Sequence, residues 1–491
     1  MKRRLIAVLL CVSLLCGCSG AEESLPDENT PVQENGIVLL EPADTEQSVT
    51  SSEAEVLPET TAETATVQTN EESAETSENA PNEQDKQTVE TETSEESASQ
   101  ESESVKPAEE TNKQDNSAPS NETAYEYTRS DLDVLLKQAA DSSYVTGLSV
   151  ALFDQSGIVH TYNTGYADKE NGVLCDDDTV YRVASVSKFV AALSLMTLYD
   201  KGELTPDSDL AELTGLPFKG NTPVKLWNLL THTAGIGDTA AYQSAVNYKY
   251  GIKGGVYTPI EELLPNSSTG SVGAAYSYTN FGAGVMGAVI ERVSGEYFCE
   301  YAYANLFAPM GLNAGYAIDQ ISDRSRIANV YLGGELNYTP KHSFRDCEYY
   351  RGYELGESYF TANTELLISC PDLARIGMMI SGDGSFNGKH ILSPEAVKLV
   401  NSVWYKTGGS FDMGLCTRIY DGNIVEGRTI YGHPGQALGN VCGLYYDPSD
   451  GTGVAICTSG SSSGTADNGV YSILNNCIKA AYNCWFDNMN E

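Results

Sequence analysis

The chain has 491 residues and a formal net charge of −39, with 68 acidic side chains against 29 basic ones. A surface this acidic repels phosphate backbones, so we expect no nucleic-acid partner. The composition divides the chain into three unequal parts, which the following paragraphs take in chain order.

Residues 1–18 have the pattern of an export signal. Met1-Lys2-Arg3-Arg4 is positively charged, and the apolar stretch 5–15 that follows is too short to span a bilayer. Leu15-Cys16-Gly17-Cys18 comes next and resembles the bacterial lipoprotein box, in which the final cysteine is lipidated. The resemblance implies a lipid on Cys18 that anchors the chain to the extracytoplasmic face of the cell membrane. A plain signal peptide with incidental cysteines is the alternative.

Residues 19–125 have the composition of a disordered tether. Between Ala21 and Tyr125 there are 28 acidic and 3 basic residues, and no aromatic residue comes before Tyr125. Such a segment cannot bury enough apolar surface to repay the entropy of ordering, and its charges repel one another. A flexible chain of this length spans on the order of 55–60 Å, enough to hold a domain away from a membrane. An acidic segment that binds a basic partner is the alternative.

Residues 126–491 are rich in aromatic residues and glycines, and we expect a folded domain there. Its first predicted elements are a helix from Thr128, two strands between Val145 and Ala167, and a helix that begins at Ser185. A mainly helical region follows, with helices at 279–294 and 370–381. Strands return at 431–433, 441–446 and 453–457, and a helix over 468–485 closes the chain.

Strands at both ends of this domain, with helices between them, indicate one sheet assembled from distant segments. We therefore predict an α+β fold, an α/β sandwich. Its antiparallel sheet is flanked by the terminal helices, and an all-helical subdomain is inserted beside the sheet.

Nine cysteines lie in the predicted domain, an odd number for an exported protein. Cys442 and Cys457 flank the turn 447–451 symmetrically, so in a simple hairpin they face each other. They form either a cross-strand disulfide or part of the core. The histidines lack paired spacing and the cysteines lack a C-x-x-C pattern, so we expect neither a metal site nor another cofactor.

Ser185-Val186-Ser187-Lys188 opens a long apolar run and places a hydroxyl and an amine on one face of the predicted helix. Residues three apart on a helix are neighbours, so the amine is close enough to take the proton of the hydroxyl. An exposed lysine near an ordinary helix start is the alternative. The S-x-x-K spacing alone does not distinguish the two.

Two further motifs follow in order, Tyr278-Thr279-Asn280 and His433-Pro434-Gly435. With Ser185-x-x-Lys188 they resemble the three motifs of the serine β-lactamase and penicillin-recognising DD-peptidase superfamily, in the branch related to class C β-lactamases. Supporting matches occur at 229–235, 369–375 and 391–397, within a similarity that covers 128–487. The resemblance implies a β-lactamase/transpeptidase-like fold, acyl-enzyme chemistry without a cofactor, and a monomer.

The resemblance assigns catalytic roles to three residues. Ser185 is expected to attack a carbonyl carbon and form an acyl-enzyme. Lys188, with a pKa lowered by burial, is expected to accept the serine proton. Tyr278 is expected to protonate the departing amine or alcohol.

The resemblance also assigns binding roles. Asn280 is expected to bind the substrate amide and to hold Lys188. The backbone N–H groups of Ser185 and Gln436 are expected to form the oxyanion hole. His433, in the motif that Gly435 completes, is expected to lie where a substrate carboxylate or acyl flank passes.

Three other features carry weaker indications. Tyr303-x-Asn305 repeats the second motif on what the pattern predicts as a helix surface. His232 is expected to be a structural, hydrogen-bonded histidine. Gly460-x-Ser462-x-Gly464 fits a nucleophile elbow, but that elbow requires a later histidine and His433 is the last one, so we expect a flexible loop.

The third motif departs from that of most β-lactamases, because His433 replaces a lysine and Pro434 replaces a threonine or serine. The exchange weakens the hold on a β-lactam carboxylate, and related DD-peptidases and esterases have histidine here. The predicted function is therefore a serine hydrolase acting on D-Ala-D-Ala peptides of peptidoglycan, as a DD-carboxypeptidase does. An esterase or β-lactamase with the same residues, or a silent penicillin-binding-like module, is the alternative.

Overall fold

The structure is a computed structural model that describes residues 127–251 and 253–487. The predicted signal peptide with Cys18 and the predicted tether lie outside the described residues. Within the two described ranges, no helix is both long enough and apolar enough to cross a bilayer.

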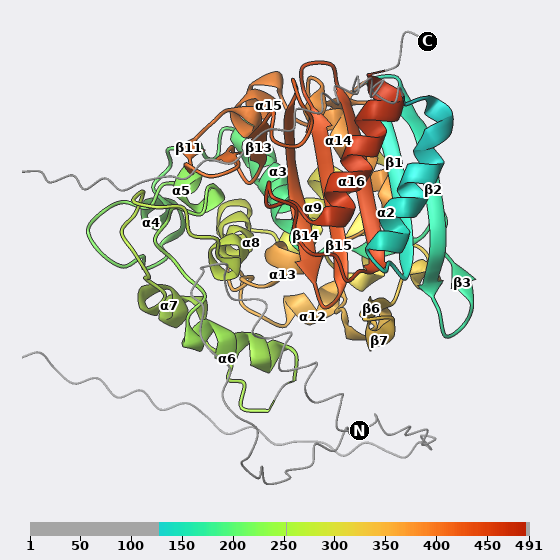
Figure 1. Cartoon of the computed structure of the whole chain (residues 1–491). Helices are drawn as coiled ribbons and strands as arrows, with labels where there is room; N and C mark the ends of the chain where they lie inside the picture. The colour runs from blue at the N-terminus through green and yellow to red at the C-terminus, as the bar shows by residue number, and fades with distance from the viewer. Residues whose placement is uncertain (1–126, 252, 488–491) are drawn as a thin grey trace, which may run out of the picture. The chain divides into compact units, whose positions relative to one another are not determined.

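A large sheet forms the centre of the described structure (Figure 1). Its main strands are β1 (Gly147–Asp154), β2 (Gly157–Asp168), β3 (Val173–Leu174), β11 (Tyr405–Lys406), β12 (Asp412–Met413), β13 (Arg418–Asp421), β14 (Thr429–Ala437), β15 (Asn440–Asp447) and β16 (Thr452–Gly460). They lie in the order β11-β12-β13-β14-β15-β16-β1-β2-β3. All neighbours on this path are antiparallel, and β1 pairs with β16, so that Ser149 lies opposite Cys457. The sheet is thus assembled from distant segments, as predicted.

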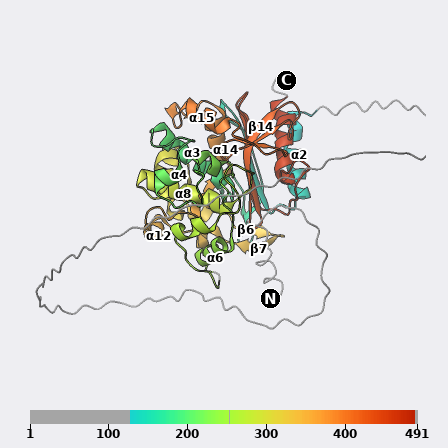
Figure 2. The ribbon, with the colours of Figure 1, turned by 90° about the vertical axis from the view of Figure 1, so that its left-hand side faces the viewer.

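Helices cover both faces of the sheet (Figure 2). The terminal helices α2 (Leu132–Ser142) and α16 (Ser472–Ala481) pack together on one face. On the other face lie α3 (Val186–Asp200) and α14 (Cys370–Ser381). The sequence prediction of an α+β fold with flanking terminal helices is confirmed.

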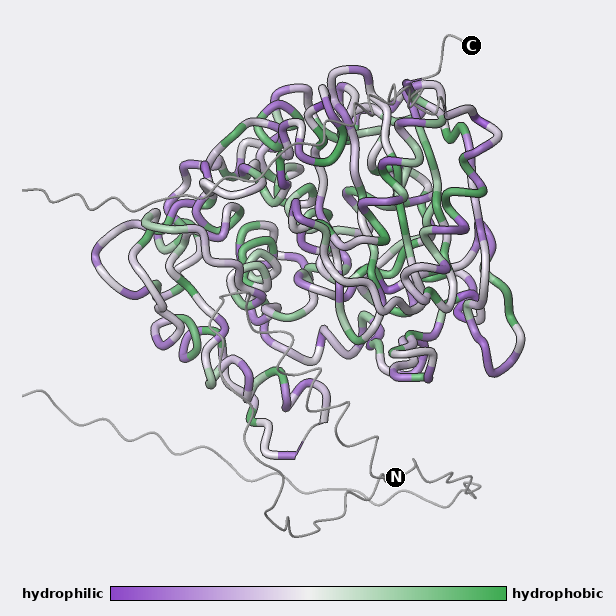
Figure 3. Tube along the Cα trace, in the orientation of Figure 1, coloured by the Kyte–Doolittle hydropathy of each residue, from purple (hydrophilic) through white to green (hydrophobic). Residues whose placement is uncertain are grey.

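The core is divided by the sheet into two main clusters. Val150 packs in the cluster that contains α2 and α16, whereas its neighbour Ala151 packs in the cluster that contains α3 and α14. This alternation follows from the strand, whose successive side chains point to opposite faces. Because both faces are covered, the central strands are apolar along most of their length, as Figure 3 shows.

The segment between β3 and β11 is mostly helical and lies largely beside the sheet (Figure 1). Its further helices are α4 (Leu210–Thr214), α5 (Leu226–Leu230), α6 (Ala240–Lys249), α7 (Ile260–Leu263), α8 (Asn280–Ser294), α9 (Phe298–Ala302), α10 (Ala308–Met310), α11 (Pro340–Ser343), α12 (Cys347–Arg351), α13 (Thr361–Thr364) and α15 (Pro394–Asn401). The segment also contains short strands, so the expectation of an all-helical insertion is wrong. These are β4 (Val180–Arg182), β5 (Ala314–Gly315), β6 (Val330–Leu332), β7 (Glu335–Tyr338), β8 (Leu367–Ser369), β9 (Ser385–Phe386) and β10 (Lys389–His390). Strands of two to four residues are too short to show alternation in a sequence.

The ends of α8 and α14 follow from local capping. The Thr279 hydroxyl accepts the N–H of Gly282 at the start of α8, and Gly295, at φ 74°, ends that helix. At the start of α14 the Ser369 hydroxyl accepts the N–H of Asp372. The helices predicted at 279–294 and 370–381 are therefore confirmed.

Cys442 and Cys457 lie directly opposite each other in β15 and β16, as the hairpin prediction requires. Both are buried free thiols. Of the two alternatives that the sequence left open, the structure has the core residues and not the disulfide.

Gly284 lets α8 pack closely against the segment around Tyr359, because a Cβ at Gly284 would collide with the carbonyl oxygen of Tyr359. We expect Gly284→Ala to lower the free energy of unfolding by about 1–3 kcal/mol, since overpacking outweighs the higher helix propensity of alanine. Denaturant unfolding followed by circular dichroism measures the change. Gly270→Ala is the control, because an added Cβ there meets nothing within 4 Å. Equal unfolding midpoints for the two variants would contradict the packing argument.

Candidate active site

Ser185 lies at the start of α3, directly after a tight turn. Ala184 in that turn has φ of 49°, a left-handed conformation that is strained for a residue with a Cβ. The Ser187 hydroxyl donates to the carbonyl of Ala184 at 2.6 Å and accepts the N–H of Leu366 at 3.0 Å. These two bonds hold the turn that presents Ser185.

Lys188 is fully buried and has three oxygen neighbours. Its Nζ lies 2.9 Å from Ser185 Oγ, 3.0 Å from Asn280 Oδ1 and 2.9 Å from the carbonyl oxygen of Asn363. None of the ion pairs in the described residues includes Lys188. Burial lowers its pKa from 10.5 to about 7, against an opposing effect of the Asp238 charge. The amine is therefore neutral in a substantial fraction of molecules at neutral pH.

The surroundings of Lys188 decide where its lone pair points. Asn280 Nδ2 donates to Asp238 Oδ2 at 2.9 Å, so Asn280 Oδ1 faces the lysine. A neutral amine has two N–H bonds, and Asn280 Oδ1 and the Asn363 carbonyl can only accept them. The lone pair is then left for Ser185 Oγ. The arrangement suits a base that takes the serine proton.

Asp238 is a site residue that no sequence motif marks. Its carboxylate accepts hydrogen bonds from the Thr279 hydroxyl at 2.8 Å, from both the backbone N–H and the side-chain amide of Asn280, and from the Phe281 N–H at 2.8 Å. The first N–H groups of a helix lack partners within the helix and carry partial positive charge. Asp238 satisfies them at the start of α8 and fixes Asn280 in the same contact.

Tyr278 lies on the other side of the serine, and its hydroxyl donates to Ser185 Oγ at 2.8 Å. Burial of the phenol raises the pKa of Tyr278 to about 12, although 37% of the residue surface is exposed. The phenol therefore keeps its proton at neutral pH. Its ring packs on the imidazole of His232, with 4.6 Å between ring centroids.

His232 supports this ring and does not touch the reacting atoms. Its Nδ1 accepts the backbone N–H of Thr279 at 3.4 Å, and burial lowers its pKa to about 3. The imidazole is thus neutral, in keeping with the structural role expected from the sequence.

Arg418 is a second site residue that sequence patterns missed. Its guanidinium carbon lies 4.6 Å from the ring centroid of Phe411 and 6.0 Å from that of Tyr278. No ion pair of the described residues includes Arg418. Nearby tyrosine oxygens hold its pKa above the ordinary value against the effect of burial. A cation that has no carboxylate partner among the described residues therefore lies beside the Tyr278 phenol.

The third motif lies in β14, close to the start of α3. A Cβ at Gly435 would collide with the carbonyl oxygen of Val183 and lie 2.9 Å from the backbone nitrogen of Ser185. Only glycine lets the strand approach the serine this closely. Gln436 follows it, so the two N–H groups predicted for the oxyanion hole come from neighbouring segments.

His433 is buried, with 1% of its surface exposed. Its Nδ1 lies 2.7 Å from the Pro434 carbonyl oxygen, and burial lowers its pKa well below 6.5. The imidazole is therefore neutral and does not replace the missing lysine cation. Its predicted contact with substrate stays a prediction.

A cavity of about 510 Å³ opens beside the site. Near the catalytic groups it is lined by Asn280, Asn363, Gln436 and Ala437, and farther away by Arg182, Lys249, Tyr250, Tyr338, His342 and Arg345. Its volume is that of a small-molecule pocket. Within the described ranges, no cluster of three or more His, Cys, Asp or Glu side chains is arranged to hold a metal.

The competing motifs lie elsewhere. Asn305 accepts a hydrogen bond from Lys201 at 2.9 Å and takes no part in the contacts of Ser185. Ser462 lies in the irregular segment after β16, where its N–H donates to the carbonyl of Ser143. The structure therefore brings together the residues of the three predicted motifs and leaves these two apart.

Comparison with known proteins gives a consistent result. Residues 132–474, well over half of the chain, match the family model described as Beta-lactamase. Penicillin-binding protein 4 of Amycolatopsis lactamdurans is 25% identical over 331 residues, 65% of this chain and 81% of that protein. Esterase EstB of Burkholderia gladioli is 28% identical over 194 residues, 37% of this chain and 49% of the esterase. The octameric penicillin-binding protein homologue from Pyrococcus abyssi has a TM-score of 0.57 at 21% identity, covering 72% of this chain and 76% of that one.

The Lys188 environment predicts a pH profile for modification of Ser185. Only the neutral amine accepts the serine proton, so labelling by an uncharged fluorophosphonate should rise with pH and reach half its plateau near the lysine pKa of about 7. Asp238→Asn removes the charge that raises this pKa, so the midpoint should move to lower pH. The second-order rate constant of labelling, measured from pH 5 to 9, tests both statements.

Asp209→Asn is the matched control for this experiment. Asp209 accepts the N–H groups of Ala211 and Glu212 at the start of α4, as Asp238 accepts two N–H groups at the start of α8, but its charge is not among those that shift the pKa of Lys188. Its midpoint should equal that of the unmodified chain. An unmoved midpoint in Asp238→Asn would show that Asp238 has no electrostatic effect on the lysine.

Proposed function

The chain belongs to the beta-lactamase family, a family of serine hydrolases, and from that premise we propose that it forms an acyl-enzyme through Ser185. One observation carries the proposal. Ser185 Oγ lies 2.9 Å from Lys188 Nζ and 2.8 Å from the Tyr278 hydroxyl. A buried amine of lowered pKa and a protonated phenol on either side of one hydroxyl provide the base and the acid that acyl transfer requires.

In the proposed reaction, Lys188 takes the proton of Ser185 while Oγ attacks the carbonyl carbon. The N–H groups of Ser185 and Gln436 stabilise the negative charge on the carbonyl oxygen. The bond between the carbonyl carbon and the leaving nitrogen or oxygen then breaks, and the Tyr278 hydroxyl donates its proton to that leaving atom. Lys188 passes the proton it took from Ser185 to the Tyr278 oxygen, so both side chains return to their starting states. Water releases the acyl group by the same steps in reverse.

We propose that the substrate is a peptide ending in D-Ala-D-Ala, cleaved as a DD-carboxypeptidase cleaves it. The leaving D-alanine carries a carboxylate. It departs beside Tyr278, which protonates its amine nitrogen. Arg418 lies on that side with its guanidinium 6.0 Å from the Tyr278 ring centroid. This cation supports a leaving group that carries a carboxylate, a role that neutral His433 does not fill.

We further propose that the enzyme works outside the cytoplasm, held to the membrane by a lipid on Cys18. The charged start, the apolar stretch 5–15 and the Leu-x-Gly-Cys sequence support export and lipidation. The acidic segment 19–125 would give the domain a reach on the order of 55–60 Å, which suits a substrate in the cell wall.

An esterase is the second candidate. The same base and acid cleave an ester, and Esterase EstB of Burkholderia gladioli is a relative at 28% identity. The neutral His433 also suits a substrate with no carboxylate at the third motif. A silent penicillin-binding-like module is disfavoured, because Ser185, Lys188 and Tyr278 are in hydrogen-bonded contact.

Ser185→Ala tests the enzyme proposal. A fluorescent penicillin and a fluorophosphonate should each label the unmodified chain, and Ser185→Ala should abolish both labels because the nucleophile is gone. Gel fluorescence measures the adducts. Ser462→Ala, in the other literal serine motif, should leave both labels unchanged. If neither reagent gives a Ser185-dependent adduct, the proposal is wrong. A fluorophosphonate adduct alone, with turnover of p-nitrophenyl esters, would favour the esterase.

Arg418→Gln tests the D-Ala-D-Ala assignment. The unmodified chain should cleave a peptide ending in D-Ala-D-Ala with a higher kcat/KM than the same peptide ending in D-alaninamide. In the variant this preference should fall about tenfold or more, the size of a hydrogen bond to a charged group. The ratio of the two kcat/KM values, from chromatographic product analysis, measures it. An unchanged ratio would remove Arg418 from carboxylate recognition.

A further inference from the structure

The large cavity beside Ser185 gathers cations in a chain whose net charge is −39. Arg182, Lys249 and Arg345 line it, together with His342. Of these four side chains, Lys249 alone has a carboxylate partner among the described residues, since its Nζ lies 2.7 Å from Glu365. The two arginines take part in no ion pair of the described ranges.

The carboxylates near this cavity are already engaged. Glu365 is buried and accepts hydrogen bonds from Lys249 and from the hydroxyls of Tyr250 and Tyr350, at 3.4 and 3.0 Å. Asp238 also lines the cavity, but its oxygens bind the start of α8. The positive charge of Arg182 and Arg345 is therefore not neutralised from within the described structure.

Arg182 is the most informative of these cations. It is the last residue of β4, three residues before Ser185, and only 4% of its surface is exposed. Its guanidinium carbon lies 5.9 Å from the ring centroid of Tyr338, and its Nη1 is buried without a hydrogen-bond partner in the described part of the chain. A buried donor left unpaired destabilises the fold, and more so when it is charged. Nη1 itself is closed to solvent, so an anion in the cavity would pair with the guanidinium through its other N–H groups or after a turn of the side chain.

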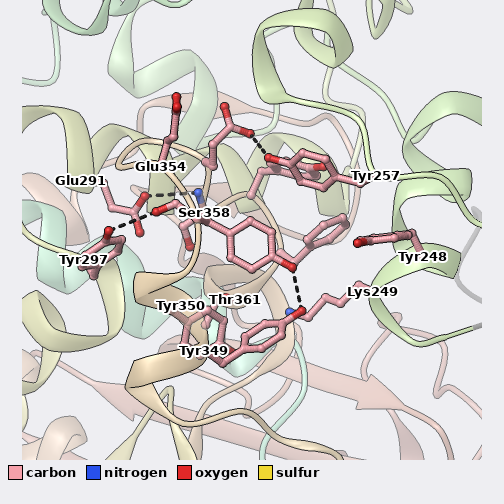
Figure 4. Close-up of a pocket in the computed structure, with 14 residues that line it drawn as sticks. Tyr248, Lys249, Tyr257, Glu291, Tyr297, Tyr349, Tyr350, Glu354, Ser358 and Thr361 are labelled. Atoms are coloured by element: carbon pink, nitrogen blue, oxygen red, sulfur yellow. Dashed lines mark hydrogen bonds between the residues drawn. The ribbon is translucent and has the colours of Figure 1, made fainter. Parts of the chain in front are cut away.

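A neighbouring pocket, lined largely by tyrosines, contrasts with the large cavity (Figure 4). It measures about 50 Å³, room for a few water molecules. Two of its three glutamates are used internally: Glu291 accepts the N–H groups of Gly356 and Ser358, and Glu357 accepts from the Tyr257 hydroxyl. Because the space is small and lies between packed tyrosines, we assign it no ligand.

In the proposed reaction, the large cavity lies on the acyl side of the scissile bond. The proposed leaving group departs beside Tyr278 and Arg418, and neither residue lines the cavity. Asn280, Gln436 and Ala437 line it instead. The cavity therefore receives the part of the substrate that stays bonded to Ser185.

We propose that this cavity binds a carboxylate carried by the acyl part of the substrate, with Arg182 as its main partner and Arg345 at the exposed rim. The inference rests on the proposed function, because only an acyl-enzyme has an acyl side. It narrows the substrate to acyl groups with an acidic side chain, such as a peptide whose acyl portion bears a free side-chain carboxylate.

Three matched thioesters test the charge preference on the full chain: N-glutaryl-, N-pentanoyl- and N-(5-aminopentanoyl)-D-alanyl thioglycolate. They share a leaving group and differ at the acyl terminus, which is anionic, neutral or cationic. We expect kcat/KM for the glutaryl compound to exceed that for the pentanoyl compound about tenfold or more, and the aminopentanoyl compound to be slowest. Thiol release measures turnover, and inhibition of Ser185 labelling by each compound gives the same ranking when release of the acyl group is slow.

Three variants show which residues cause the preference for the glutaryl compound. In Arg182→Gln the glutaryl advantage should fall to within about threefold, the loss expected when a hydrogen bond between charged groups is removed. Arg345→Gln, at an exposed position, should reduce the advantage in part. Arg324→Gln removes an exposed arginine that does not line the cavity and should leave the advantage unchanged.

The outcomes separate this inference from the proposed function. If the pentanoyl or aminopentanoyl compound ranks first in the unmodified chain while Ser185 is labelled by fluorophosphonate, the inference is wrong and the acyl-enzyme proposal stands. If no Ser185-dependent adduct forms with any reagent, the proposed function fails instead. Circular dichroism shows whether Arg182→Gln is folded. If it is unfolded, the test passes to Arg345→Gln: a glutaryl-over-pentanoyl ratio of kcat/KM equal to that of Arg324→Gln overturns the inference.

Discussion

The site depends on one constraint: a lysine is buried, and no carboxylate of the described residues forms an ion pair with it. Lys188 Nζ has three oxygen neighbours, and they come from a serine, an amide and a backbone carbonyl. A direct carboxylate would keep the ammonium charged and useless as a base. Burial without one lowers the pKa from 10.5 to about 7. Since one pKa unit corresponds to about 1.4 kcal/mol, the fold tolerates a cost of several kcal/mol at neutral pH to hold this amine.

A negative charge lies near the lysine but not in contact with it, because the Asn280 side chain lies between Lys188 and Asp238. Asp238 binds the first N–H groups of α8, where helix geometry leaves donors unpaired, and it turns the Asn280 amide so that its oxygen meets Lys188. The lysine thus receives a fixed, uncharged acceptor, and the charge of Asp238 only moderates its pKa. Gly284 permits α8 to pack closely on the Tyr359 segment, and this packing holds α8, and with it Asn280, in position.

The elements that the sequence predicted well have strong local signals. The apolar run after Ser185 and the capped start of α14 depend on neighbours within a few residues. The short strand β4 has no such signal, because its three residues are specified by pairing with β8, far along the chain.

The same distinction holds in the candidate site. Ser185, Lys188, Tyr278 and Asn280 belong to spaced motifs and were found. Asp238, Asn363 and Arg418 act through contacts with residues distant in the chain, and no spacing pattern marks them. The burial of His433 was missed for a related reason, since a strand motif does not show which side chains the neighbouring elements cover.

The distribution of charge determines how a substrate would be selected. From residue 126 onward the chain has a net charge of −17, so the long-range field of this part repels an anionic substrate and does not steer it inward. Two groups of arginines without an ion pair in the described residues lie beside Ser185: Arg418 near the proposed leaving group, and Arg182 with Arg345 on the proposed acyl side. Recognition of an anion would then depend on short hydrogen bonds made after encounter, where burial strengthens them. Such a site would gain selectivity through contact at the cost of slower capture.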